Sequence, residues 1–221
     1  MKSIFVTGTD TDVGKTRISV ALIALLQQQG KRVAAMKPIA SGCDMTDKGL
    51  RNDDAMQLSQ QADVSISYEV LNPYAFEPAI APHIAAQQVD VNIDLDVIKQ
   101  NFNEIQKQAD SVVVEGAGGW LVPLNEQQTM ADLAMELGLP VVLVVDIKLG
   151  CINHALLTVD AIKQSGLVLH SWVANQRQEN QQADEIIATL KHAISAPLLG
   201  TVPVLTPQQS AVSFLNNLNL G

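Results

Sequence analysis

The feature of this chain that most constrains its fold is a glycine loop close to the amino terminus. Residues 8–16 read GTDTDVGKT; they follow the apolar segment 3–7 and open a helical pattern over residues 15–29. A strand, a glycine loop and a helix in this order are typical of a phosphate-binding loop, in which backbone N–H groups at the helix start face phosphate oxygens. Five residues separate the two glycines where the common pattern has four, so the loop is a variant. The sequence predicts nucleotide binding here; the alternative is a purely structural turn.

Two side chains of this loop carry the expected chemistry. In phosphate-binding loops the lysine contacts the terminal phosphates and the hydroxyl that follows it binds Mg²⁺. We therefore expect Lys15 to contact the nucleotide phosphates and Thr16 to bind the accompanying magnesium ion.

The composition excludes several classes of protein. Hydrophobic residues make up 47% of the 221, enough to bury the core of one α/β domain over residues 1–221. A net charge of −9 argues against a broad basic surface for nucleic acid. Cys43 and Cys151 are the only cysteines, which excludes a disulfide framework and a four-cysteine zinc site. Neither a signal-peptide core nor a membrane-spanning apolar run is present in the sequence, so a soluble, cytoplasmic protein without a membrane partner is expected.

Short apolar runs alternate with amphipathic segments of helical length. Strands are expected over residues 3–7, 32–36, 111–115, 140–146, 168–175 and 197–202. Helices are expected over residues 15–29, 53–61, 95–108, 129–136, 153–164 and 183–192. This alternation predicts an α/β fold with a mainly parallel sheet flanked by helices on both faces, as in P-loop NTPases. Residues 38–94 are expected to form a loop-and-helix insertion.

Ligands of open parallel sheets bind beyond the carboxyl ends of the strands, which draws attention to Glu115 and Lys37. Glu115 ends the buried run 112–114, where a carboxylate is costly unless it meets a metal or a cation. We therefore expect it to bind metal rather than to lie at the surface. Lys37 follows the second expected strand and precedes Pro38. It could reach the phosphate loop or be a solvated surface lysine.

Other candidates stay open on their residues alone. Asp54 could bind metal, but Asp53 or Asp54 could equally cap the helix that follows. Asn175 offers a donor and an acceptor that match the edge of adenine, or it could form a turn. The segment 150–154 precedes an expected helix and could bind an anion through its N–H groups, with Asn153 as a simple N-cap in the alternative. Cys151 is expected to be a small buried residue rather than a nucleophile.

The order of these motifs over nearly the whole chain resembles the dethiobiotin synthetase family. The motifs are VTGTDTDVGKT at 6–16, KPIASG at 37–42, GLRNDDA at 49–55, NPY at 72–74, VEGAGGW at 114–120, KLGCINHA at 148–155, WVAN at 172–175 and APLLG at 196–200. The five-residue glycine gap is the form that this family has. The family often has Glu where this chain has Asp12, and the sequence after Pro207 matches it poorly.

The resemblance implies an enzyme of biotin biosynthesis that converts 7,8-diaminopelargonate, CO₂ and ATP to dethiobiotin, ADP and phosphate. One amine captures CO₂ as a carbamate, the γ-phosphoryl group activates the carbamate, and the second amine closes the ureido ring. A homodimer with its substrate site at the subunit interface is also implied.

The resemblance assigns roles to individual residues. Catalysis would depend on Lys15, Lys37 and Thr11, and Mg²⁺ would be bound by Thr16, Asp54 and Glu115. The substrate would be bound by Ser41 and, from the other subunit, by Gly150, Cys151 and Asn153. The nucleotide would contact Asp12, Val13, Gly14, Lys15, Thr16, Arg17, Asp54, Glu115, Gly116, Ala117, Gly118, Asn175, Gln176, Val204, Leu205 and Thr206, with Asn175 reading adenine.

Two other functions are weighed against this one. Partitioning ATPases are molecular switches that share this kind of P-loop and carry an extra lysine early in the loop, where this chain has Asp10. The chain also has no basic or amphipathic tail for DNA or membrane. Corrin-amidating ligases are nearer in chemistry, but they need a glutamine-hydrolysing domain that 221 residues cannot hold.

Overall fold

The computed structural model describes residues 3–206 and 208–218, and within them the largest element is a six-stranded parallel sheet. Its strand order is β10-β9-β8-β1-β7-β2. The bounds are β1 Ile4–Gly8, β2 Val33–Met36, β7 Ser111–Gly119, β8 Val141–Asp146, β9 Leu169–Asn175 and β10 Leu198–Val202. The fold class expected from the sequence is confirmed, and the strand starts differ from the expected ones by at most one residue.

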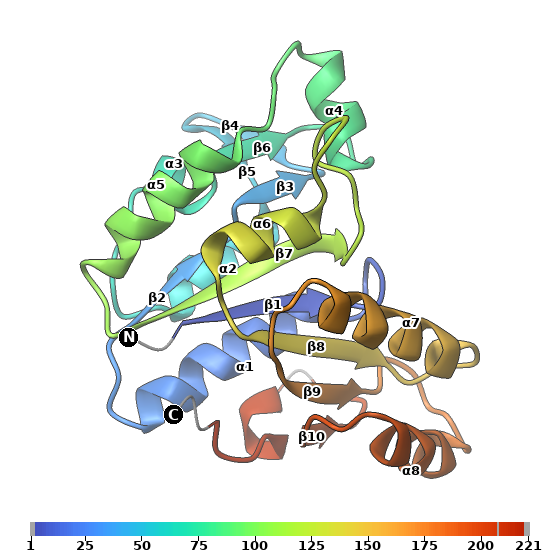
Figure 1. The fold of residues 1–221 in the computed structure, drawn as a ribbon. Coiled ribbons are helices and arrows are strands. Elements are labelled where there is room, and N and C mark those ends of the chain that lie inside the picture. Colours follow the sequence, from blue (N-terminus) through green and yellow to red (C-terminus); the bar gives the residue numbers. More distant parts are fainter. Residues whose placement is uncertain (1–2, 207, 219–221) are drawn as a thin grey trace.

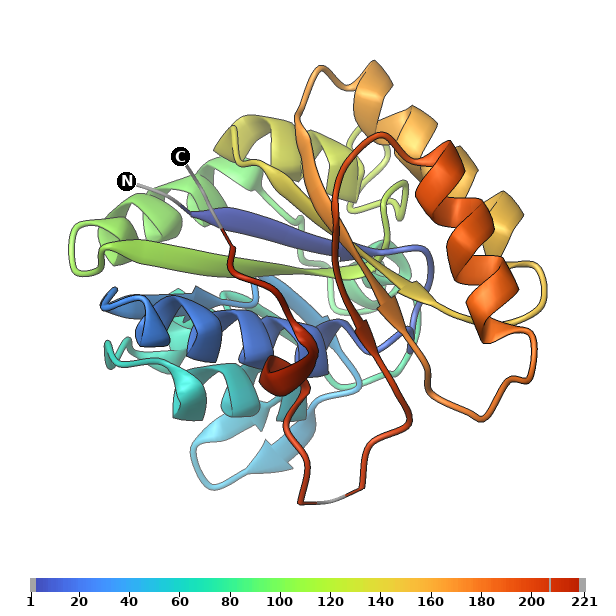
Figure 2. The same ribbon diagram turned by 90° about the horizontal axis from the view of Figure 1, so that it is seen from below.

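Helices cover both faces of this sheet (Figure 1). Their bounds are α1 Lys15–Gln28, α2 Asp53–Gln61, α3 Tyr68–Leu71, α4 Pro82–Gln88, α5 Leu95–Gln106, α6 Met130–Leu137, α7 Cys151–Gln164 and α8 Ala183–Ala193, with a 3₁₀ turn, η1, at Ala211–Phe214. Side chains alternate between the faces along each strand. In β1, Ile4 and Val6 pack in the cluster that contains α1 and η1, whereas Phe5 packs in the cluster of α5 and α6. Figure 2 shows η1 beside α1, and α7 beside α8 at the other half of the sheet.

The insertion of residues 38–94 holds more than loops and helices. Besides α2, α3 and α4 it contains a parallel pair, β3 Ile39–Ser41 with β6 Tyr74–Phe76, and a hairpin of β4 Asp44–Thr46 and β5 Gly49–Arg51. The sequence expectation missed these strands because three residues are too few to establish a period of two.

All six strands of the main sheet end at one edge, and the loops that follow them gather there. The phosphate loop follows β1, which lies between β7 and β8 at the centre of the sheet. The ends of β2 and β7 therefore lie on one side of the loop, and those of β8 and β9 on the other (Figure 1). Among residues 3–206 and 208–218, no helix has the length and apolar character that a bilayer span requires.

Candidate active site

A cavity of about 940 Å³ lies at this edge, between the phosphate loop and the insertion. Its lining comes from residues that are far apart in the sequence but are brought together by the parallel strands. They are Thr11, Asp12, Gly14, Lys15, Thr16, Arg17, Lys37, Ala40, Ser41, Gly42, Asn52, Asp54, Gln57, Ala79, Ile80, Ala81, Pro82, Glu115, Ala117, Gly118, Val122 and Arg177. The expected residues of the loop, of the 37–42 segment, of α2 and of β7 thus share one cavity.

The phosphate loop is held in a conformation that only some residues tolerate. Gly14 has φ +92°, and a Cβ there would lie 2.2 Å from Asn175 Nδ2, so the position needs glycine. Asp12 also has a positive φ, 57°, a conformation that Asp adopts more readily than most residues. Asn175 Nδ2 donates to Val13 O at 2.8 Å, and Arg177 donates to Asp12 O. The last residue of β9 and the segment after it therefore hold the backbone of the phosphate loop in place.

Lys15 is enclosed by the loop that it belongs to. The residue is only 7% exposed, and its Nζ donates to Asp10 O at 2.9 Å. Burial, followed by the positive charge of Lys37, lowers the pKa of Lys15 to about 8, against the opposing carboxylates Glu115, Asp54 and Asp10. Lys15 is therefore charged at neutral pH but close to its titration range.

Glu115 is the centre of the charged cluster. The residue is fully buried, and its Oε1 accepts from Thr16 Oγ1 at 2.9 Å and from Lys37 Nζ at 2.6 Å. Its Oε2 has no hydrogen-bond partner within the described part of the chain. A buried carboxylate oxygen with spare acceptor capacity, directly beside the loop threonine, is a strong candidate ligand for a hard cation.

Lys37 lies between two carboxylates. Besides Glu115, Nζ lies 3.4 Å from Asp54 Oδ2 and donates to Gly116 O at 3.3 Å. Burial alone would lower the pKa of Lys37, but the charges and hydrogen bonds of Glu115 and Asp54 outweigh it and raise the pKa above its ordinary value. Lys37 is therefore a buried, charged ammonium in the cavity wall and not a solvated surface lysine.

The start of α2 decides between the two readings of Asp54. The N-cap is Asn52, whose Oδ1 accepts from Ala55 N at 3.2 Å. The capping alternative for Asp53 or Asp54 is therefore wrong, because both residues lie inside the first turn. There both carboxylates interact favourably with the helix dipole. Asp54 also points its carboxylate at Lys37.

The residues expected around the base lie apart from this lining but close to the loop. Asn175 is the last residue of β9 and is fully buried, with its amide on Val13 O and not on a turn of its own. Gln176 N donates to Val202 O at 2.8 Å, which brings the start of the 176–182 loop beside the end of β10. The segment 204–206 follows that end; Pro207 lies outside the described residues.

The segment 150–153 is the first turn of α7. Gly150 is the N-cap, with φ +88°, and the helix begins at Cys151, so the reading of Asn153 as N-cap is wrong by three residues. Cys151 is buried, and burial raises the pKa of its thiol, in line with a small core residue. Among the described residues that line the 940 Å³ cavity, none comes from this turn of the same chain.

Sequence reasoning missed part of the lining. Arg177 comes two residues after β9, at the carboxyl ends of the strands where ligands of such sheets are expected, but no sequence motif marked it. Ala79–Pro82 close the cavity from the insertion, where the sequence has no periodic pattern.

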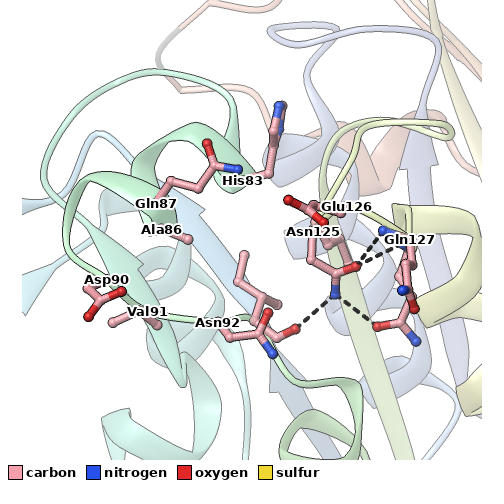
Figure 3. A pocket seen from close by; sticks show the side chains of 12 residues that line it. His83, Ala86, Gln87, Asp90, Val91, Asn92, Asn125, Glu126 and Gln127 are labelled. Carbon is pink, nitrogen blue, oxygen red and sulfur yellow. Dashed lines mark hydrogen bonds between the residues drawn. The ribbon is translucent and has the colours of Figure 1, made fainter.

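A second cavity, of about 540 Å³, lies between α4 and the 124–128 loop (Figure 3). Asn125 organises it, with Nδ2 donating to Ile93 O at 3.2 Å and to Gln128 Oε1 at 2.9 Å. Asp90 and Glu126 are the charged residues of its described lining, which contains no lysine or arginine. An anionic phosphate would find no compensating cation there, so the cavity beside Lys15 is the candidate active site.

Comparison with known proteins identifies the family. A protein-family model described as an AAA domain matches residues 2–211. The ATP-dependent dethiobiotin synthetase of Cellvibrio japonicus is 50% identical over 206 residues, which are 93% of this chain and 90% of the relative. The chain belongs to the dethiobiotin synthetase family. The ATP-dependent dethiobiotin synthetase of Yersinia pestis is 47% identical, over 93% of this chain and 86% of the relative.

Solved structures with the same fold are more distant. The septum site-determining protein MinD of Pyrococcus horikoshii, complexed with Mg-ADP, has a TM-score of 0.59 at 14% identity, over 97% of this chain and 93% of that one. The MinD cell division protein of Aquifex aeolicus has a TM-score of 0.58 at 15% identity, over 94% and 84% of the two chains. These likenesses show the fold alone. Membership of the dethiobiotin synthetase family confirms the expected enzyme class, an ATP-dependent ligase of biotin biosynthesis.

The lowered pKa of Lys15 predicts how ATP affinity depends on pH in this dethiobiotin synthetase family member. If Lys15 contacts the nucleotide phosphates, it is already charged below pH 8, whereas above pH 8 the free protein must take up a proton on binding. The dissociation constant of a fluorescent ATP analogue should be flat from pH 6.5 to 7.5 and rise by up to roughly tenfold per unit above pH 8. In Lys15→Arg, whose cation does not titrate in this range, the rise should disappear. A flat profile to pH 9.5 in the unaltered protein would refute the assigned pKa.

Proposed function

We propose that this protein closes the ureido ring of dethiobiotin in the cavity beside the phosphate loop, from 7,8-diaminopelargonate, CO₂ and ATP. The observation that carries the proposal is the convergence of Lys15, Thr16, Lys37 and Glu115 at one wall of that cavity, from the start of α1, the end of β2 and the middle of β7. The carbamate, the γ-phosphate and the phosphoryl group in transfer are all anionic, and this wall concentrates two lysines in a protein of net charge −9.

The chemistry proceeds in three steps. The lone pair of one substrate amine adds to the carbon of CO₂ and the amine loses a proton, which gives a carbamate. A carbamate oxygen then attacks the γ-phosphorus of ATP, and the bond from that phosphorus to the β-phosphate oxygen breaks, which releases ADP. The second amine finally attacks the carbonyl of the carbamic-phosphoric anhydride, loses a proton and expels phosphate as the ring closes.

The two lysines suit the second step. Charge on the phosphoryl oxygens and on the leaving β-phosphate oxygen is stabilised by cations fixed in place before the reaction. Lys37 is already fixed by Glu115 and Asp54, so little rearrangement is needed to present its ammonium group. Lys15 would contact the terminal phosphates.

The residues also fit a magnesium ion. Mg²⁺ takes few protein ligands, usually one or two carboxylates beside phosphate oxygens and waters. Glu115, Thr16 and Asp54 offer two carboxylates and a hydroxyl, and Glu115 Oε2 is still unpaired among the residues the structure describes. When bound, the ion would neutralise phosphate charge.

Substrate and base contacts complete the proposal. Thr11 and Ser41 line the same cavity as Lys37 and would hydrogen-bond the amine and carbamate end of the substrate. Asp12, Gly14, Arg17, Ala117 and Gly118 would surround the phosphates and the sugar. Asn175 would read adenine, with Gln176 and residues 204–206 beside the base. Val13 and Gly116 would contact the nucleotide through their backbone groups.

A homodimer would complete the site. Leu121, Leu149 and Leu157 are 63%, 99% and 62% exposed, and exposed apolar side chains that cluster on a surface often mark a site of protein–protein contact. Leu121 and Leu157 border a groove of about 400 Å³ between α7 and the turn after β7. A second copy packed on this surface would cover them and could bring its own Gly150–Asn153 turn to the substrate carboxylate, which the helix N-terminus would bind.

The decisive assay compares ATP turnover with and without the diamine. Purified protein given Mg²⁺, bicarbonate and ATP should release ADP only when diaminopelargonate is added, in equal amounts with dethiobiotin. Turnover that ignores the diamine would refute the proposal and favour a molecular switch like the partitioning ATPases.

A further inference from the structure

The chain holds a hydrogen-bonded bridge behind the cavity wall, made by side chains that do not line the cavity. Tyr68, in α3, and Asn72, directly after it, lie outside the described lining. Asn72 is buried, and the ring of Tyr68 lies 4.0 Å from the guanidinium carbon of Arg51.

One end of the bridge fixes Lys37. Asn72 Nδ2 donates to Lys37 O at 2.6 Å and to Tyr74 O at 3.4 Å. Lys37 N donates to Leu71 O at 3.0 Å, so both backbone polar groups of Lys37 are held by residues 71 and 72. This is needed because β2 ends at Met36, and Pro38 can donate nothing to a continued strand.

The other end fixes the start of α2. Tyr68 Oη accepts from Asn52 N at 2.7 Å and donates to Asn72 Oδ1 at 2.9 Å. Asn52 is the N-cap of α2, so its position sets where Asp54 lies, two residues later. Among the described residues, Tyr68 Oη thus links Asn72, which holds the backbone of Lys37, to Asn52, which begins the helix of Asp54.

The amide of Asn72 leaves little freedom in this arrangement. Both of its N–H groups donate to carbonyls, so its Oδ1 must accept, and only a protonated phenol can donate to it. Burial raises the pKa of Tyr68, which keeps the phenol protonated throughout the working pH range.

We propose that Tyr68 and Asn72 are positioning residues that hold Lys37 and Asp54 at their working separation, an inference that rests on the ring-closing function proposed above. Lys37 directly follows β2 whereas Asp54 lies in α2, and their 3.4 Å contact is partly exposed on the aspartate side. Such a contact does not fix a geometry by itself, whereas the three hydrogen bonds of 2.6–2.9 Å that join Lys37 O to Asn52 N behind it do.

Tyr68→Phe tests this inference because it removes only the hydroxyl and keeps the ring on Arg51. The matched control is Tyr74→Phe. The hydroxyl of Tyr74 accepts from Asp94 N at 3.0 Å near α5 and touches neither Lys37 nor Asp54. We expect Tyr68→Phe to lower kcat by about tenfold, since small displacements of catalytic groups have large effects on rate. The KM for ATP should change by less than about twofold, and Tyr74→Phe should leave kcat within about twofold.

A double-mutant cycle separates positioning from simple destabilisation. If Tyr68 acts through Asp54, Tyr68→Phe should lower kcat by less than about threefold in an Asp54→Asn background. Thermal unfolding, followed in parallel, should shift equally in both backgrounds. Asn72→Ser, which removes both amide donors, should lower kcat in the same way. It takes the place of Tyr68→Phe in the test if Tyr68→Phe does not fold.

The outcomes are distinct. Equal kcat in Tyr68→Phe and Tyr74→Phe, or a full tenfold loss that persists in Asp54→Asn, overturns the positioning role while the proposed function stands. Full activity in both Lys37→Ala and Asp54→Asn would likewise overturn the inference, because neither group would then need positioning. Only the absence of diamine-dependent dethiobiotin formation in the unaltered protein would overturn the proposed function, and the inference with it.

Discussion

Lys37→Ala should lower kcat for dethiobiotin formation by at least about 100-fold, because it removes a fixed cation from the place where phosphoryl charge develops. The loss should be in kcat more than in the KM for ATP, since Lys15 and the loop amides would still bind the nucleotide. Steady-state rates with varied ATP and varied diamine measure both constants.

The control for this variant must separate catalysis from folding. Removing Lys37 leaves Glu115 buried without its ion-pair partner, which costs about 3–5 kcal/mol of stability. Thermal unfolding should therefore accompany the kinetics, with assays well below the transition. Lys99→Ala, which breaks the exposed pair of Lys99 with Glu136, should leave kcat unchanged. An active Lys37→Ala would remove this residue from the catalytic machinery.

Mixing two impaired variants should restore activity, assayed at a diamine concentration below the KM of the unaltered protein, if the site is shared between subunits. Gly150→Asp places a negative charge at the proposed carboxylate site and should raise the KM for the diamine by more than about tenfold. A hybrid dimer of Gly150→Asp with Lys37→Ala has one site in which both contributions are intact. Random mixing gives hybrids in about half of the dimers, so about a quarter of the original activity should return.

The arithmetic makes this result diagnostic. If the Gly150–Asn153 turn served the cavity of its own chain, every site in the mixture would keep one defect and activity would stay at the level of the separate variants. Analytical ultracentrifugation shows whether the mixture is dimeric, and co-purification of differently tagged variants shows whether hybrids form. An absence of restoration in a sample that contains hybrids contradicts the shared site.

The sequence was most informative where burial conflicts with charge. Glu115 could be singled out because a carboxylate at the end of Val112–Val114 needs a partner, and the structure places Thr16 and Lys37 on it. The strands of the main sheet could also be predicted from the sequence, since strands that are buried on both faces form unbroken apolar runs.

It was least informative where the choice depends on tertiary contacts. Asn52, Asp53 and Asp54 can all cap a helix, and the register of α2 is set by the bond from Asn52 N to Tyr68, which no local pattern reveals. Arg177 reaches Asp12 across 165 positions of the sequence. The roles proposed for Gly150, Cys151 and Asn153 require a second chain and rest on the resemblance to the family.

Isotope transfer tests the central claim most directly. If the carbamate oxygen attacks the γ-phosphorus and leaves with it, CO₂ labelled with ¹⁸O must deliver one labelled oxygen to each phosphate released with dethiobiotin. Mass spectrometry of that phosphate should show one ¹⁸O per molecule. Phosphate without the label, at full dethiobiotin yield, would contradict activation of the carbamate in this cavity.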